Sequence, residues 1–207
     1  MTADKIAKSL IFILKPAFFP LLAVIFLFNS DTYISLYTTV FQLRIYLIIF
    51  IITILFPASF IPVLFSLGIF ETLKIVTKKE NIIILSILAI TNLITFFLLR
   101  YLPVYINSMI LLVFLVSAFI FFVSIIFTMW SSICFNMLSI GSLAGFICSV
   151  SIIFAKDYFY ILAAVFLVAG LIGFAKLQLQ QKNQFEIYSA FVIGFAINII
   201  FFLSILN

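Results

Sequence analysis

"YLPVYINSMILLVFLVSAFIFFVSIIFTMWSSICFNMLSIGSLAGFICSVSIIFA", residues 101–155, holds no charged side chain. As one helix, this run would extend about 82 Å at 1.5 Å per residue, whereas the hydrocarbon core of a bilayer is about 30 Å thick. The run must therefore fold back, and polar side chains interrupt its apolar pattern at "TMWSSICFN" (128–136). The stretch predicts two consecutive membrane-spanning helices.

The remaining composition extends this prediction to the whole chain. Hydrophobic residues make up 67% of the 207 positions and charged residues 8%, where a soluble domain has about a quarter charged. We expect an all-α, polytopic helical bundle in the membrane, with residues 1–207 forming a single membrane domain. The expected spans are about 9–28, 45–67, 82–99, 106–129, 133–154, 158–175 and 187–206.

The first of these spans is the least regular. Its uninterrupted apolar part, between Pro16 and Phe28, is too short to cross a bilayer alone. Extended back to Ser9 it can span, with Lys15 reaching toward the headgroups. This interpretation gives seven spans, and a re-entrant first segment with six spans is the alternative.

Basic residues predict the orientation. With seven spans, eight lysines fall on the amino-terminal side, against Arg44, Arg100 and Lys156 on the other side. The eight are Lys5, Lys8, Lys15, Lys74, Lys78, Lys79, Lys176 and Lys182. Cytoplasmic loops carry the Lys/Arg excess, which predicts that the amino terminus lies inside. We expect the protein in the cytoplasmic (inner) membrane. The connections 68–81, 130–132 and 176–186 then share one face.

Several kinds of chemistry are not expected. The chain has no His, and Glu71, Asp157 and Glu186 are isolated, so neither an imidazole base nor a carboxylate pair is visible. Cys134 and Cys148 lie about 21 Å apart along one predicted helix, too far for a disulfide. We expect no metal, no cofactor and no nucleic-acid partner.

Small residues recur at helical spacing in two apolar segments. Gly141 and Gly145 form G-x-x-x-G, and Ala190 and Gly194 repeat the small-xxx-small spacing on the last span. In membranes, this spacing lets helix backbones approach closely, so we interpret all four as helix-packing residues.

Polar and proline residues within the spans suggest further contacts. Asn92 and Asn198 lie near mid-span, where an amide needs a partner. Interhelical hydrogen bonds are the favoured interpretation, and a substrate path is the alternative. Pro57 and Pro62 predict a kink in the second span.

The polar stretch "KLQLQQKNQFEIYSAF", residues 176–191, stands out between the last two apolar runs. Positive-inside topology alone would explain its lysines. Its frame, however, resembles the third motif of the type 2 phosphatidic acid phosphatase superfamily, S-R-x5-H-x3-D. Here that frame reads Ala175, Lys176, five residues, Lys182, three residues and Glu186.

Two further segments are similar to motifs of the same family. "NMLSIGSLAG" (136–145) looks like the segment after the second-motif histidine, with Asn136 in the histidine's place. Lys74 and Asn81 have the spacing of the first motif, K-x6-R-P, with Asn for arginine and Ile82 for proline. The resemblance covers about residues 70–200.

The resemblance implies a phosphate site whose catalysis is lost. In the family, the third-motif histidine attacks phosphorus, a carboxylate orients it, and the second-motif histidine protonates the leaving oxygen. Lys74 and Lys176 would still hold a phosphate, and Glu186 would remain the carboxylate. Lys182 is a poor nucleophile, because an unperturbed lysine has a pKa of about 10.4. Asn136 cannot act as a general acid.

These observations lead to competing functional hypotheses. The first is a non-catalytic phosphatase-like protein that binds phosphorylated lipid or isoprenoid headgroups at Lys74, Lys176 and Lys182. The second is a structural or accessory subunit, with a membrane-protein partner or a second copy docked on its small-residue helices. An active phosphatase with a non-histidine mechanism ranks lowest. A transporter is disfavoured because few charges lie within the spans.

Overall fold

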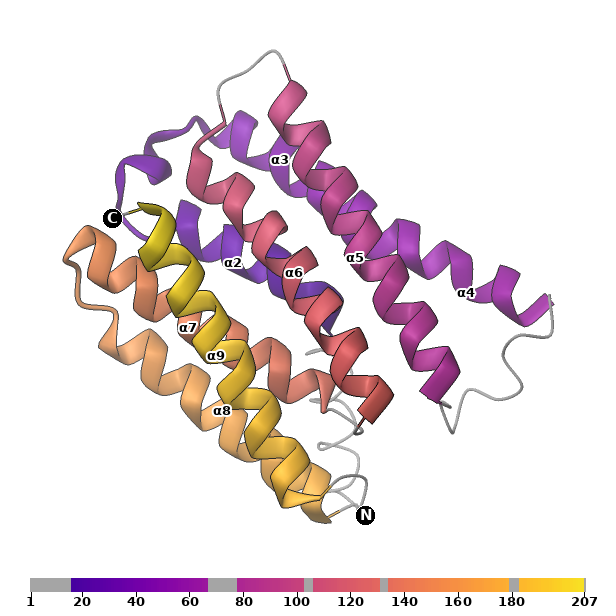
Figure 1. Cartoon of the computed structure of the whole chain (residues 1–207). Helices are drawn as coiled ribbons and strands as arrows, with labels where there is room; N and C mark the ends of the chain where they lie inside the picture. Colours follow the sequence, from indigo (N-terminus) through magenta and orange to yellow (C-terminus); the bar gives the residue numbers. More distant parts are fainter. Residues whose placement is uncertain (1–15, 67–77, 103–105, 131–133, 179–182, 207) are drawn as a thin grey trace, which may run out of the picture. The chain divides into compact units, whose positions relative to one another are not determined.

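The computed structural model describes residues 16–66, 78–102, 106–130, 134–178 and 183–206. Within these residues every regular element is a helix, which confirms the all-α prediction (Figure 1). The elements are η1 (Pro16–Phe18), α2 (Phe19–Phe28), η2 (Tyr33–Leu36), α3 (Thr39–Phe50), η3 (Ile51–Leu55), α4 (Phe56–Ser66), α5 (Lys78–Tyr101), α6 (Ser108–Trp130), α7 (Phe135–Phe154), α8 (Phe159–Gln178) and α9 (Gln184–Leu206).

Six of the described helical segments are long and apolar enough to cross a membrane. They are Thr39–Leu64, which joins α3, η3 and most of α4, and then Lys78–Tyr101, Ser108–Met129, Phe135–Phe154, Phe159–Gln178 and Gln184–Ile205. Of the predicted span 9–28, residues 9–15 lie outside the described residues. The described helix α2 has 10 residues, about half of what a crossing requires.

The observed helices extend beyond the predicted spans where charged residues stand. The second span begins at Thr39 rather than at 45, so that Arg44 lies inside the helix with its side chain exposed. α5 begins at Lys78 rather than at 82. Charge-free runs underestimate helix length because Lys and Arg side chains at a helix end reach the headgroups while the backbone stays helical.

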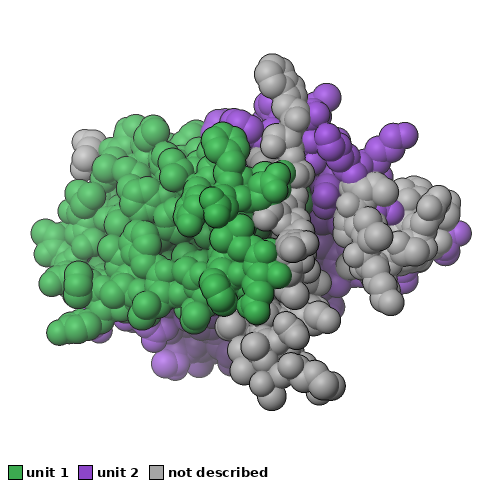
Figure 2. Space-filling view, turned by 90° about the horizontal axis from the view of Figure 1, so that it is seen from below, with its two compact units in different colours: residues 1–19, 133–207 green, residues 20–132 purple. Residues whose placement is uncertain are grey.

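The chain divides into two compact units, within what the sequence analysis treats as one membrane domain (Figure 2). Unit 1 comprises residues 1–19 and 133–207, and unit 2 comprises residues 20–132. The two units are described separately below.

In unit 2, α5 packs against α6 on one side and against η3 and α4 on another. The segment η3 is a single stretch of π-helix, in which the N–H of Phe56 bonds to the carbonyl of Ile51, five residues earlier. It ends at Leu55, two residues before Pro57, which has no N–H to donate. The sequence predicted a kink at Pro57 and Pro62, and what the structure describes beside Pro57 is this wide π-helical turn, which the sequence did not indicate.

In unit 1, α7 packs against both α8 and α9. Most of α7 is buried, which explains why polar residues such as Ser139, Ser142 and Ser149 occur along it. Ser142 and Ser149 bond back to carbonyls of their own helix, so the burial of these hydroxyls leaves no donor unsatisfied.

Candidate functional site

The α7–α9 contact is the closest helix pairing in unit 1, and it rests on glycine. A Cβ atom placed on Gly141 would lie 2.9 Å from Cα of Phe191, and one on Gly145 would lie 3.0 Å from Cα of Phe195. On α9, a Cβ atom on Gly194 would lie 2.9 Å from the backbone nitrogen of Ser142. Only residues without a side chain permit this approach.

Ala190 is completely buried on the same helix, one turn before Gly194. All four small residues singled out in the sequence therefore lie buried in unit 1, and the three glycines line the contact between α7 and α9. Here we call this contact the glycine seam. It consists of Gly141, Gly145 and Gly194, with the buried Ala190 one turn before Gly194 on α9.

The glycine seam also fixes the register of the two helices. Gly141 faces Phe191, and Gly145 faces Phe195, four residues further along both helices. The helices therefore run parallel, and residues that differ by about 50 in number lie at the same level. Asn136 lies five residues before Gly141, and Glu186 lies five residues before Phe191. This register therefore brings Asn136 and Glu186 to the same level along the helix axes.

Helix α8 brings Lys176 to the same end. A Cβ atom on Gly173 would lie 3.6 Å from Cγ2 of Ile187 and 3.8 Å from Cε of Met137, the residues that follow Glu186 and Asn136. Lys176 stands about one helical turn beyond Gly173, in the last turn of α8. We call this part of unit 1, with Asn136, Lys176 and Glu186, the remnant-motif end, after the motif positions that the sequence resemblance assigned to these residues.

The local sequence suits this end of the unit. Glu186 lies in the first turn of α9 and Lys176 in the last turn of α8, where each charge complements the helix dipole. Asn136 is 9% exposed, whereas Lys176 and Glu186 are half-buried. Each of the three makes at least one polar or electrostatic interaction.

The other predicted site residues fall elsewhere. Lys74 and Lys182 lie outside the described residues, so the predicted three-lysine cluster has one described member, Lys176. Asn81 is half-buried in the first turns of α5, in unit 2. Among the described residues there is no group of three or more side chains of the kinds that hold a metal ion.

The two mid-span asparagines do not form the interhelical hydrogen bonds that the sequence predicted. Nδ2 of Asn92 donates to the carbonyl of Leu88, 2.7 Å away, and Nδ2 of Asn198 donates to the carbonyl of Gly194, 3.1 Å away. The Oδ1 atom of each is buried and has no partner within the described structure. The prediction is wrong because the side chain of an asparagine on a helix can reach its own i−4 carbonyl, and both amides donate there instead of to another helix.

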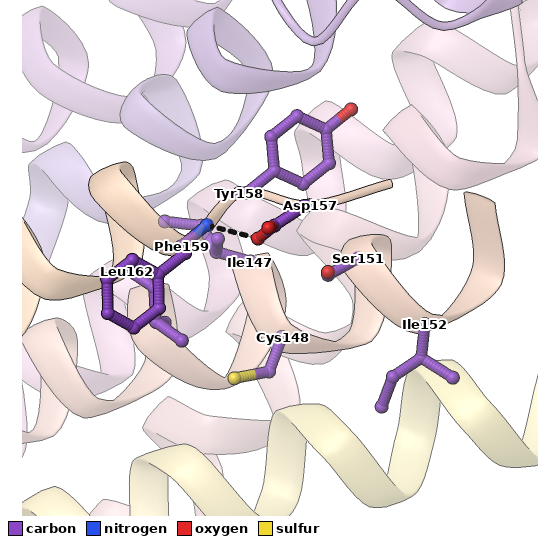
Figure 3. Close-up of a pocket in the computed structure, with 8 residues that line it drawn as sticks. All are labelled: Ile147, Cys148, Ser151, Ile152, Asp157, Tyr158, Phe159 and Leu162. Carbon is purple, nitrogen blue, oxygen red and sulfur yellow. Dashed lines mark hydrogen bonds between the residues drawn. The ribbon is translucent and has the colours of Figure 1, made fainter. Parts of the chain in front are cut away.

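A cavity that the sequence analysis missed lies where α7 meets α8 (Figure 3). It is partly open, has a volume of about 210 Å³, and is lined by Ile147, Cys148, Ser151, Ile152, Asp157, Tyr158, Phe159 and Leu162. Asp157 is the charged residue of this lining, and its carboxylate accepts a hydrogen bond from the N–H of Phe159 at 2.9 Å. In the sequence, the charges at 156–157 indicated only the end of a span.

Together these features define a multi-pass α-helical membrane protein with a polar end and an apolar cavity in unit 1. Compared with protein-family models, with curated proteins and with solved structures, the chain matches none.

Proposed function

We propose that this chain is a non-catalytic, phosphatase-like protein that binds phosphorylated lipid or isoprenoid headgroups at the remnant-motif end of unit 1. The observation that supports the proposal is the register of the glycine seam. It brings Asn136 and Glu186 to one level, and the contacts of Gly173 with Met137 and Ile187 put the last turn of α8, which carries Lys176, at the same end of the unit. These three positions come from two separate motifs of the family resemblance.

The chemistry of this end suits an anion. The amino-terminal ends of α7 and α9 lie together there, and helix amino termini attract phosphate through unpaired N–H groups and the helix dipole. Lys176 adds a full positive charge, and the amide of Asn136 offers N–H donors. Glu186 would hold a lysine in place rather than contact the phosphate, because like charges repel.

Binding without turnover follows from the residue types. Asn136 replaces the general acid and Lys182 replaces the nucleophile of the resembled family. General acid–base assistance is typically worth about 10²–10⁴-fold in rate, and the covalent route is lost as well. The proposal includes a bacterial inner-membrane location with the amino terminus in the cytoplasm. In this topology the connections 68–81 and 176–186 share one face, so cysteines substituted at Lys79 and Lys182 should label from the same side.

Binding is best tested with matched lysine variants at the two ends of the α7–α8 hairpin. Lys176→Gln removes the cation at the remnant-motif end, and Lys156→Gln removes one at the other end of the hairpin. With the full chain in phosphatidylcholine nanodiscs, we expect Lys176→Gln to weaken phosphatidate binding about tenfold, as for a hydrogen bond to a charged group. Lys156→Gln should leave it unchanged, and native mass spectrometry measures both.

Two results would contradict the proposal. Equal losses in both variants would mean that basic residues attract phosphatidate without a site. Release of inorganic phosphate from phosphatidate, phosphatidylglycerol phosphate or undecaprenyl diphosphate, abolished by Lys182→Ala, would mean that the protein is an enzyme.

The accessory-subunit hypothesis is less well supported in its original form. It required the small-residue helices to be docking surfaces, but this chain's own helices already cover Gly141, Gly145 and Gly194.

A further inference from the structure

We propose that the cavity between α7 and α8 binds a membrane lipid whose headgroup carries a primary ammonium, with an alkyl chain in the cavity and the ammonium on Asp157. This site lies at the opposite end of α7 from the remnant-motif end. It is therefore independent of the proposed function, and neither depends on the other.

The lining of the cavity fits an alkyl chain. Ile147 and Ile152 come from the last turns of α7, and Phe159 and Leu162 come from the first turn of α8 (Figure 3). Ile152 and Phe159 are 59% and 65% exposed, so the cavity opens on an apolar surface of the hairpin. Compact ligands usually occupy roughly 300–1,000 Å³, so a cavity of about 210 Å³ suits part of a chain rather than a whole compact ligand.

The position of Asp157 fits a headgroup. It stands in the short connection between the end of α7 at Phe154 and the start of α8 at Phe159. The ends of two spanning helices lie at the level of the lipid headgroups. The bond from the Phe159 N–H orients the carboxylate at the start of α8, and the side chain remains exposed.

The polar atoms at this site favour a ligand that donates hydrogen bonds. A carboxylate only accepts hydrogen bonds. The hydroxyl group of Ser151 donates its hydrogen to the carbonyl of Lys156, so Ser151 presents lone pairs to the cavity. A primary ammonium supplies both a positive charge and N–H donors, and such charge-assisted bonds are the stronger ones. A choline headgroup carries the positive charge but has no N–H donor. A headgroup with a net negative charge would be repelled by the Asp157 carboxylate.

Cys148 provides a built-in reporter, because its thiol lines the cavity. The chain's other cysteine, Cys134, is 2% exposed at the far end of α7 and can be removed as Cys134→Ser. The experiment measures the rate at which N-ethylmaleimide modifies Cys148 in full-length Cys134→Ser protein. The nanodiscs contain phosphatidylcholine alone, or phosphatidylcholine with phosphatidylethanolamine or phosphatidylglycerol.

We expect phosphatidylethanolamine to slow modification at least about threefold, which is the scale of one partly exposed charge pair. Phosphatidylglycerol should have no such effect. Asp157→Asn should abolish the protection. The control Asp31→Asn, which neutralises an exposed carboxylate in unit 2, should retain it.

A series of lipids keeps the test decisive even if Asp157→Asn does not fold. With the unaltered aspartate, protection should decrease as the ethanolamine nitrogen is methylated once, twice and three times, because each methyl group removes an N–H donor. Equal rates in all membranes would overturn the proposal. Protection that persists in Asp157→Asn, or that does not change with methylation, would also overturn it, since a chain would then enter without headgroup recognition.

Discussion

The α7–α9 pair of unit 1 and the α5–α6 pair of unit 2 are both long apolar helices in close contact, but they pack by different means. The first pair contains Gly141, Gly145 and Gly194, which bring backbone against backbone. The second contains no glycine, and its buried positions on α5 include Leu85, Leu88, Asn92, Thr95 and Leu99 at spacings of three and four, together with Glu80, Ala89 and Thr91.

The hydroxyl groups of the second pair do not join its two helices. Thr95 donates to the carbonyl of Thr91, Ser117 to that of Val113, and Ser124 to that of Ile120. All are buried, and each bond stays within one helix. Lipid tails are as apolar as leucine, so burial of apolar surface gives little drive for helices to associate in a membrane. Close backbone contact therefore matters more in unit 1, and side-chain fit matters more in unit 2.

The largest effect should come from closing the glycine seam. Gly141→Ala should lower the free energy of unfolding by about 2–3 kcal/mol, the upper range for overpacking, because the Phe191 backbone cannot move aside as a flexible side chain can. Unfolding in mixed detergent micelles measures the change.

Gly170→Ala on α8 is the matched control. A Cβ atom at Gly170 meets nothing within 4 Å, so alanine should stabilise the helix by about 0.5–1 kcal/mol. If both substitutions have similar effects, the glycine seam does not have the packing role described here.

The second effect separates the two mid-span asparagines. Asn92→Leu should raise the free energy of unfolding by about 1 kcal/mol, because it removes the buried Oδ1 atom that has no partner in the described structure. Asn198→Leu removes an equivalent atom, but Asn198 lies one turn beyond Gly194, next to the glycine seam. At position 198, the larger leucine side chain should crowd the glycine seam and cancel the gain in the free energy of unfolding. Equal gains in the free energy of unfolding at both positions would mean that the α5–α6 and α7–α9 helix pairs accommodate a larger side chain equally well.

The smallest effect concerns two residues with left-handed backbone conformation, one in each unit. Ala155, with φ of 50°, ends α7, and Ala155→Gly should stabilise the protein by about 0.5 kcal/mol, because the relief of alanine's strain in this conformation is partly offset by the conformational entropy that glycine loses. Asp31, with φ of 49°, should gain less from Asp31→Gly, because aspartate adopts this conformation more readily. Thermal unfolding of the two variants compares them, and a larger gain at Asp31 would contradict this explanation.

The candidate sites differed in how far the sequence could predict them. The spacing of Gly141 and Gly145 indicated a packing surface, but not that α9 would cover it. The resemblance singled out Asn136, Lys176 and Glu186, and the predicted topology put their connections on one membrane face, but neither indicated which helix contacts bring them to one end of unit 1. The cavity beside Asp157 had no sequence signal, because its lining comes from the ends of two helices and the connection between them.

By itself, the sequence determined that this is a multi-pass helical membrane protein and approximately where its helices run. Charge-free runs of about 20 residues suffice for that, because a backbone in hydrocarbon must satisfy its hydrogen bonds within its own helix. The alternation of spans already made α7 and α9 parallel, and only the tertiary structure decided that they are in contact and that Asn92 and Asn198 bond to their own helices. It also decided that a cavity forms at Asp157. These features depend on which helix faces meet, and in a chain that is apolar on nearly every face, hydrophobic periodicity does not specify the partner.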